Sequence, residues 1–164
     1  MESIANVGDM AARVSGVAWT TALIRLEIAL WERVNARLLE AHELSLAFFE
    51  PLRLISVAPM DSMRVGDLAQ QLRITVGGTS KLVDRIVEAG LIAREPDPDD
   101  RRASRVSLTR VGERKVTTAL KTYEAEVARI LARVLSPEEQ RQMGDYVSRL
   151  LTSDRKSTRL NSSH

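Results

Sequence analysis

The sequence has no cysteine, which excludes disulfides, thiol redox sensing and cysteine metal sites. Aromatic residues make up only 4% of the chain, so the core must consist mainly of Leu, Ile, Val and Ala. No apolar run approaches the roughly 20 residues that a membrane helix needs. Glu2, Asp9 and Arg13 interrupt the first stretch, which therefore lacks a secretory pattern. We expect a cytoplasmic protein without a membrane partner.

A strong excess of one charge is also missing. The formal net charge is +2, but Arg155, Lys156 and Arg159 lie in the last ten residues, which contain no acid. Without these ten residues the chain has 21 basic and 22 acidic side chains. Bulk charge therefore gives no argument for nucleic-acid binding. Residues 155–164 are polar and Ser-rich, and we interpret them as a disordered, non-native tail.

Catalytic patterns are absent from the sequence as well. There is no Ser-His-Asp arrangement and no Gly-rich loop that would cradle a phosphate. The two histidines are His42 and His164, too few to favour a zinc site. Glu138 and Glu139 are typical of a helix start rather than of a catalytic pair. The sequence predicts no enzyme, no cofactor and no metal.

The first half of the chain predicts two helices. Apolar residues recur at three- and four-residue steps over about residues 14–40, which indicates one long helix. Ser45 can cap a second helix, in which Pro51 should delay the start or cause a kink. The polar residues that follow Pro59 should end this element.

Two short helical patterns come next, at about residues 65–72 and 76–89. Thr75 is a natural N-cap for the second pattern, and Gly90 is a natural stop. The expected core face of the second helix consists of Val76, Leu82, Val83, Ile86 and Val87. Two short helices with a tight connection form a helix-turn-helix candidate.

A predicted β-hairpin follows this helix pair directly. Residues 91–95 form the first predicted strand, and a turn rich in Pro and Asp follows it. Residues 103–108 form the second, antiparallel strand. A helix pair followed by such a hairpin is a winged helix-turn-helix. The predicted fold class is thus mainly α with a small β-hairpin.

Two further helices close the predicted domain. The first runs over about residues 110–135, and Ser136, Pro137 and Glu139 mark the start of the second. A small module offers too little surface to cover long apolar helices at both ends, so dimerisation should resolve the excess. We expect one domain over residues 1–154, with a winged core at about 45–110. The dimerisation helices are expected at about 14–40 and 110–151.

Four motifs carry a family resemblance. They are Leu82-Val83-Asp84-Arg85-Ile86, Glu88-Ala89-Gly90-Leu91-Ile92, Asp99-Asp100-Arg101-Arg102-Ala103, and Val106-Ser107-Leu108-Thr109 with Gly112. At this spacing the sequence resembles the MarR family of bacterial regulators over nearly all of residues 14–151. The resemblance implies a homodimer with two recognition helices in successive major grooves and two wings on the flanking minor grooves. It also implies a repressor that a small anionic or phenolic effector releases from DNA. A two-fold dimer should bind a pseudo-palindromic operator.

The residues expected to face double-stranded DNA are Thr75, Gly77, Gly78, Ser80, Lys81 and Arg85 of the second helix, and Asp100, Arg101 and Arg102 of the wing. Lys81 can donate to guanine O6 and N7, whereas Arg85 is better placed for a phosphate. Asp100 can orient Arg102 toward a narrow minor groove. A solvated helix face and a solvated charged turn are the alternatives.

Gly77 and Gly78 depart from the Ser/Thr-rich pattern of the family, and Thr79 stands where the family has an apolar residue. Each helical glycine costs roughly 0.5–1 kcal/mol relative to alanine. The pair either allows close approach to DNA or is tolerated near the helix end. A second reading of the whole chain therefore stays open, namely a winged-helix protein-interaction module that has lost DNA binding.

The sequence does not define an effector pocket. Candidates for lining a cleft are Trp19, Trp31, His42, Phe48, Phe49 and Arg53. Core packing is the better explanation for the apolar members of this set, and a loop position is the better explanation for His42.

Overall fold

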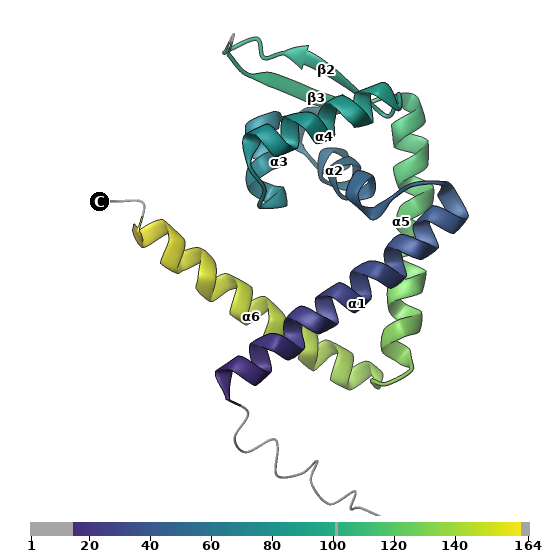
Figure 1. The fold of residues 1–164 in the computed structure, drawn as a ribbon, viewed down its shortest axis with the longest axis vertical. Coiled ribbons are helices and arrows are strands. Elements are labelled where there is room, and N and C mark those ends of the chain that lie inside the picture. Colours follow the sequence, from purple (N-terminus) through teal and green to yellow (C-terminus); the bar gives the residue numbers. More distant parts are fainter. Residues whose placement is uncertain (1–14, 101, 162–164) are drawn as a thin grey trace, which may run out of the picture. The chain divides into compact units, whose positions relative to one another are not determined.

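The computed structural model describes residues 15–100 and 102–161 (Figure 1). The elements are α1 (Gly16–His42), α2 (Leu46–Ser56), η2 (Pro59–Asp61), β1 (Ser62–Arg64), α3 (Val65–Leu72), α4 (Val76–Glu88), β2 (Ile92–Pro96), β3 (Ser104–Leu108), α5 (Arg110–Ala132) and α6 (Pro137–Asn161). This order confirms the predicted fold class. The chain divides into two compact units, and the division falls between Tyr123 and Glu124 inside α5. No helix within the described ranges is long and apolar enough to cross a bilayer.

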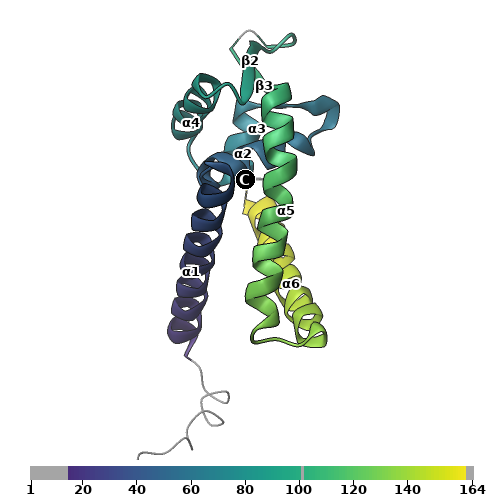
Figure 2. The same cartoon turned by 90° about the vertical axis from the view of Figure 1, so that its right-hand side faces the viewer.

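Helix α1 begins at a side-chain cap and ends in a left-handed residue. The Ser15 hydroxyl accepts a hydrogen bond from the Ala18 N–H at 3.3 Å, and Glu43 closes the helix with a φ of 50°. Val34 and Leu38 are buried near its C-terminal end. Figure 2 shows the rest of α1 extending away from the lobe that contains α2, α3 and α4. Along this extension large apolar side chains are exposed, namely Val17, Trp19, Leu23, Ile24, Leu26, Ile28 and Trp31.

Helix α2 starts at Leu46, so the predicted delay caused by Pro51 is wrong. The Ser45 hydroxyl caps the helix by accepting from the Phe48 N–H at 3.3 Å. Pro51 lies inside the helix, where it cannot donate to the preceding turn. Its ring is fully buried together with Leu52 and Ile55. Tertiary packing of this face offsets the lost hydrogen bond.

The core of the first unit is almost entirely aliphatic, as the scarcity of aromatics predicted. Its fully buried members include Leu38, Leu44, Leu52, Ile55, Leu68, Val83, Ile86, Ile92 and Val106. Phe49 is the aromatic exception, and its ring stacks on Tyr123 with centroids 5.3 Å apart. His42 is the last residue of α1, so the expected loop position is wrong, and its Nε2 lies 2.7 Å from the Thr122 hydroxyl. Phe49 therefore packs in the core, as expected, whereas core packing is wrong for Trp19 and Trp31, which are each 46% exposed.

The sheet has three antiparallel strands in the order β1-β3-β2. Val106 of β3 pairs with Met63 of β1 on one side and with Arg94 of β2 on the other. Strand β1 was not predicted, because the residues after Pro59 were interpreted only as the end of a helix. It has three residues, of which only Met63 is buried. Such a strand is too short to show the alternation of apolar and polar residues that predicts a strand.

The junction between the hairpin and α5 depends on backbone contact. The Thr109 hydroxyl accepts from the Gly112 N–H at 3.1 Å and lies 2.7 Å from the Gly90 carbonyl oxygen. A Cβ on Gly112 would lie 2.0 Å from the Leu91 carbonyl oxygen, so only glycine fits there. Gly90 itself has a φ of 71°, as the predicted helix stop requires.

The second unit contains the end of α5 and helix α6. The Ser136 N–H donates to Glu139 Oε2 at 2.7 Å, and the Glu139 N–H donates to the Ser136 hydroxyl at 3.4 Å. This confirms the predicted helix start, and the same hydrogen bonds lower the pKa of Glu139. Helix α6 continues to Asn161, so the prediction that residues 155–161 are disordered is wrong. Extending an existing helix adds one backbone hydrogen bond per residue without a new nucleation cost. Residues 162–164 lie outside the described part.

Candidate nucleic-acid interface

Helix α4 is fixed at its start by a threonine cap. The Thr75 hydroxyl accepts from the Gly78 N–H at 3.1 Å, as predicted. The Thr75 carbonyl oxygen in turn accepts from the Thr79 hydroxyl at 3.0 Å. Thr79 is fully buried, and this hydrogen bond satisfies its hydroxyl at a position that resembled an apolar site of the family.

The buried face of α4 is narrower than the sequence predicted. Thr79, Val83 and Ile86 are buried. Val76 is 60% exposed and Val87 is 36% exposed, so their assignment to the core is wrong. Val76 is the first residue of the helix, and Val87 is next to its last residue, Glu88. The exposed residues of α4 include Thr75 at the cap, Gly77, Gly78, Lys81 and Arg85, and Ser80 is partly exposed.

The hairpin of β2 and β3, which forms the wing, lies beside α4 (Figure 1). Arg94 of β2 connects the two elements. Its Nη1 donates to Asp84 Oδ1 at 2.7 Å and to the Ser80 hydroxyl at 3.2 Å, both on α4. Its Nε donates to the Ser104 hydroxyl on β3 at 2.9 Å. One guanidinium thus links the helix to both strands of the wing.

Arg85 also has a partner inside the chain. Its guanidinium carbon lies 5.4 Å from the centroid of the Phe48 ring on α2. A cation at this distance from a ring face gains roughly 0.5–1 kcal/mol at an exposed site. The contact restrains the side chain while leaving it exposed to solvent.

A buried acid, Asp97, organises the base of the wing turn. Its carboxylate accepts from Arg64 Nε at 2.7 Å and Nη2 at 3.0 Å, and from Arg105 Nη1 at 3.4 Å. It also accepts the backbone N–H groups of Asp99 at 2.9 Å and Asp100 at 3.1 Å. The hydrogen bond from Arg64 is the main reason that the pKa of Asp97 is lowered to about 2. The negative charge of Asp97 is therefore compensated inside the chain by Arg64 and Arg105.

The wing turn itself holds the other predicted contacts. The Arg102 N–H donates to Asp100 Oδ1 at 2.9 Å, and both residues are exposed. Asp100 therefore fixes the backbone at Arg102, from which the guanidinium extends. Arg101 lies outside the described residues.

Sequence reasoning did not assign roles to Arg64, Arg94, Asp97 and Arg105. Arg64 and Asp97 are 33 positions apart and meet only because β1 and β2 flank the same central strand. The spacing of these residues carries no local signal for an ion pair. Asp97 did carry one general signal, since an acid in a turn readily accepts backbone N–H groups two and three residues ahead.

Comparisons with known proteins find similarity in the segment that contains α3, α4 and β2. Residues 52–103 match the family model described as the MarR family. Over this segment the chain is similar to the MarR family. The matched segment contains the end of α2, the helix pair and the first wing strand, so the family pattern coincides with the candidate interface.

A curated relative of this chain is the HTH-type transcriptional repressor MdtR of Bacillus subtilis (strain 168). It is 28% identical over 125 residues, which cover 74% of this chain and 79% of the relative. Among solved structures, AbsC from Streptomyces coelicolor matches with a TM-score of 0.73 and 23% identity, covering 88% of this chain and 98% of AbsC. Sco3205 from the same organism, solved in complex with DNA, matches with a TM-score of 0.74 and 20% identity, covering 87% and 90%.

The curated relative and the matched structures are themselves named as transcription regulators. The structural matches, at 23% identity and below, establish that the chain has the MarR winged-helix fold.

Proposed function

We propose that the chain is a cytoplasmic, homodimeric repressor that binds double-stranded DNA. In this proposal α4 enters the major groove and the wing contacts the adjacent minor groove. The observation that carries it is the set of hydrogen bonds by which Arg94 joins α4 to the wing. Lys81 and Arg85 of α4 and Arg102 of the wing are exposed to solvent. MdtR is named a repressor, and Sco3205 was solved with DNA, which supports the same role here.

The geometry favours DNA binding over a module that has lost it. Asp84 and Asp97, two acids close to the proposed interface, are each paired with arginine. Basic groups on the exposed face therefore meet less repulsion from the acids of this near-neutral chain. A module selected only for protein contacts would not require this pairing of acids around α4 and the wing.

Exposed apolar residues support the homodimer. Helix α1 exposes Trp19, Ile24, Ile28 and Trp31, each by 46% or more. Helix α6, in the second unit, separately exposes Tyr146, Val147, Leu150 and Leu151. If these helices pack against their copies in a two-fold dimer, the exposed apolar side chains are covered. The same dimer would place two recognition helices about one helical turn of DNA apart. The expected operator is a pseudo-palindrome.

The MarR resemblance also supports release from DNA by a small aromatic or anionic effector. Two of the aromatic residues suggested for an effector cleft have other contacts. Phe49 is buried in the core, and the ring of Phe48 contacts the Arg85 guanidinium. The presence of an effector is best tested by binding experiments on the purified protein.

A gel-shift titration with the DNA upstream of the gene tests the proposal. Lys81→Ala and Arg102→Ala should each weaken binding by roughly 1–3 kcal/mol, because each removes one groove or phosphate contact. The apparent association constant of the wild type should fall steeply as salt increases, since neutralised phosphates release counterions.

Arg33→Ala is the matched control, because it removes the same charge from an exposed site on α1 that is distant in sequence from α4 and the wing. It should bind as the wild type does. A wild-type dimer that shifts no upstream fragment at any salt concentration would instead support the protein-interaction module.

A further inference from the structure

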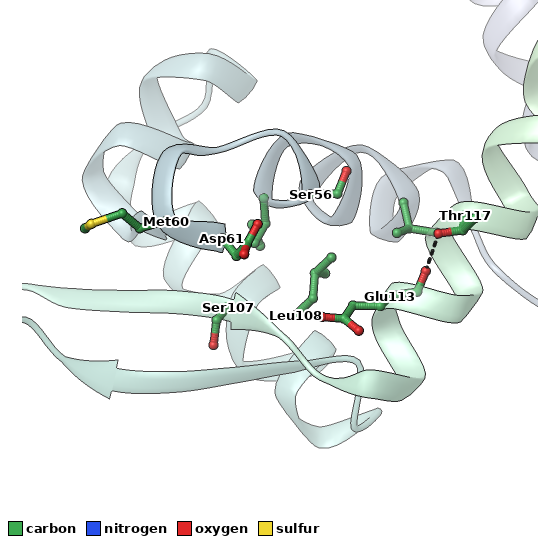
Figure 3. Close-up of a pocket in the computed structure, with 9 residues that line it drawn as sticks. Ser56, Met60, Asp61, Ser107, Leu108, Glu113 and Thr117 are labelled. Carbon is green, nitrogen blue, oxygen red and sulfur yellow. Dashed lines mark hydrogen bonds between the residues drawn. The ribbon is translucent and has the colours of Figure 1, made fainter.

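A cavity lies in the first unit on the side formed by the end of α2, the η2 turn, β3 and the first turns of α5 (Figure 3). Its volume is about 470 Å³, within the range of pockets that hold drug-sized molecules. The lining residues are Ile55, Ser56, Met60, Asp61, Ser107, Leu108, Glu113, Val116 and Thr117. None of them belongs to the candidate effector-lining set that the sequence suggested.

The cavity combines an apolar floor with a polar rim. Ile55 and Val116 are buried, and Leu108 lies beside them. Figure 3 shows Asp61 and Glu113 approaching the hollow from opposite elements, the η2 turn and α5. An apolar floor with few convergent polar groups is typical of a small-molecule site.

The charge of this lining has one sign. Two carboxylates and no Lys or Arg contribute to the lining. Asp61 and Glu113 form no ion pair with any residue in the described part of the chain. A ligand cation would therefore meet two carboxylates without displacing an internal partner, whereas a ligand anion would be repelled.

We propose that this cavity is a binding site for small organic cations, such as protonated amines that carry an apolar ring system. The ring system occupies the floor at Ile55, Leu108 and Val116. The ammonium group lies between Asp61 and Glu113 at the rim. This class differs in charge from the anionic effectors that the family resemblance implies.

The cavity wall is connected to the wing by a short chain of hydrogen bonds. Asp61 precedes Ser62, whose hydroxyl accepts from Arg105 Nη2 at 3.0 Å and Nε at 3.2 Å. Arg105 in turn donates to Asp97 at the base of the wing turn. A ligand that moves the η2 turn therefore acts on the residue pair that shapes the wing. This step rests on the proposed function, because it concerns affinity for DNA.

Calorimetric titration of the full chain at neutral pH tests the site without DNA. The probes are naphthylmethylamine, naphthylmethanol and naphthoate, which share one ring system and differ in charge. The amine should bind most tightly and naphthoate most weakly. Asp61→Asn and Glu113→Gln should each weaken the amine about fivefold, the upper end for an exposed ion pair, and leave the alcohol unchanged.

The variants are chosen to preserve the fold. Asp61 has a φ of 54°, and asparagine tolerates this left-handed conformation. Glu43→Gln is the control, since Glu43 is an exposed acid outside the cavity lining, and it should bind the amine as the wild type does. Equal binding of all three probes, or unchanged amine affinity in both cavity variants, would overturn the site.

Fluorescence anisotropy with labelled operator tests the link to the wing. Saturating amine should change the affinity of the wild type for DNA and should have no effect on the Asp61→Asn/Glu113→Gln double variant. If the amine binds with the expected selectivity but DNA affinity does not change, the link to the wing is wrong and the site stands. If the protein binds no DNA at all, the proposed function fails, while calorimetry still decides the cavity.

Discussion

At the scale of single residues, Asp97 is the most constrained polar group of the wing. Its buried carboxylate accepts hydrogen bonds from Arg64, Arg105 and two backbone N–H groups. Removing one partner of a buried ion pair leaves the other charge without compensation. The wing should therefore depend on Asp97 more than on the exposed acids of the same turn.

We predict that Asp97→Asn lowers the Tm at neutral pH by several degrees and weakens DNA binding. The pKa of Asp97, about 2, lies below its ordinary value of 3.8. Ionised Asp97 therefore stabilises the fold above about pH 4, and this contribution is lost as the pH falls through about 2. Thermal unfolding across this range should show the wild type and the variant converging at the acidic end.

Asp99→Asn is the matched control, because Asp99 is exposed and contacts Asp97 through its backbone N–H. It should keep the wild-type Tm. A constant difference in Tm between Asp97→Asn and the wild type from pH 7 to about 2 would contradict an ionised role for Asp97.

At the scale of elements, α4 combines a sound cap with two glycines in its first turn. A Cβ on Gly77 would meet no atom within 4 Å, whereas one on Gly78 would lie 3.1 Å from the Thr75 hydroxyl. The two positions therefore differ in a way that the sequence did not show. Gly77 faces open space, and Gly78 lies against the cap.

We predict that Gly77→Ala raises the free energy of unfolding by up to about 0.5–1 kcal/mol, because alanine restricts the unfolded chain and favours the helix. DNA affinity should fall, because the added methyl group separates the helix backbone from DNA. Denaturant unfolding and gel shift measure the two effects. Gly78→Ala should gain less stability, since its Cβ crowds Thr75. Unchanged DNA affinity of Gly77→Ala would mean that the glycines are only tolerated.

Other elements show which local signals were reliable. The caps at Ser45, Thr75 and Ser136 were predicted correctly, because a cap is decided by residues three positions apart. Strand β1 and the uninterrupted start of α2 were not predicted. Each depends on partners far away in the sequence, namely β3 for the strand and the core around Pro51 for the helix.

At the scale of the whole molecule, α1 exposes to solvent a row of large apolar side chains that a stable fold normally covers. Ile24, Ile28 and Trp31 recur at helical spacing and are each about half exposed. A soluble monomer rarely exposes a large contiguous apolar surface. A second copy of the chain is the partner that the proposed function supplies.

We predict that Ile28→Glu raises the dimer dissociation constant roughly tenfold or more, because the two-fold axis places a charge from each protomer in an apolar interface. Sedimentation equilibrium measures this change. Operator binding should weaken in parallel, since a monomer contacts one half-site. Ala29→Glu, which adds the same charge at the next position on the helix, should remain a dimer. An Ile28→Glu chain that stays dimeric would place the interface elsewhere.

The sequence by itself determined the order of the helices, their caps, the hairpin after the helix pair and the family pattern, because these features depend on neighbours within a few residues. The tertiary structure alone decided the Arg94 link, the burial of Asp97 between two arginines, the third strand and the cavity beside α5. These features join residues that are up to 62 positions apart, such as Ile55 and Thr117. Only the folded chain brings such residues together, because no local periodicity records which distant side chains will meet.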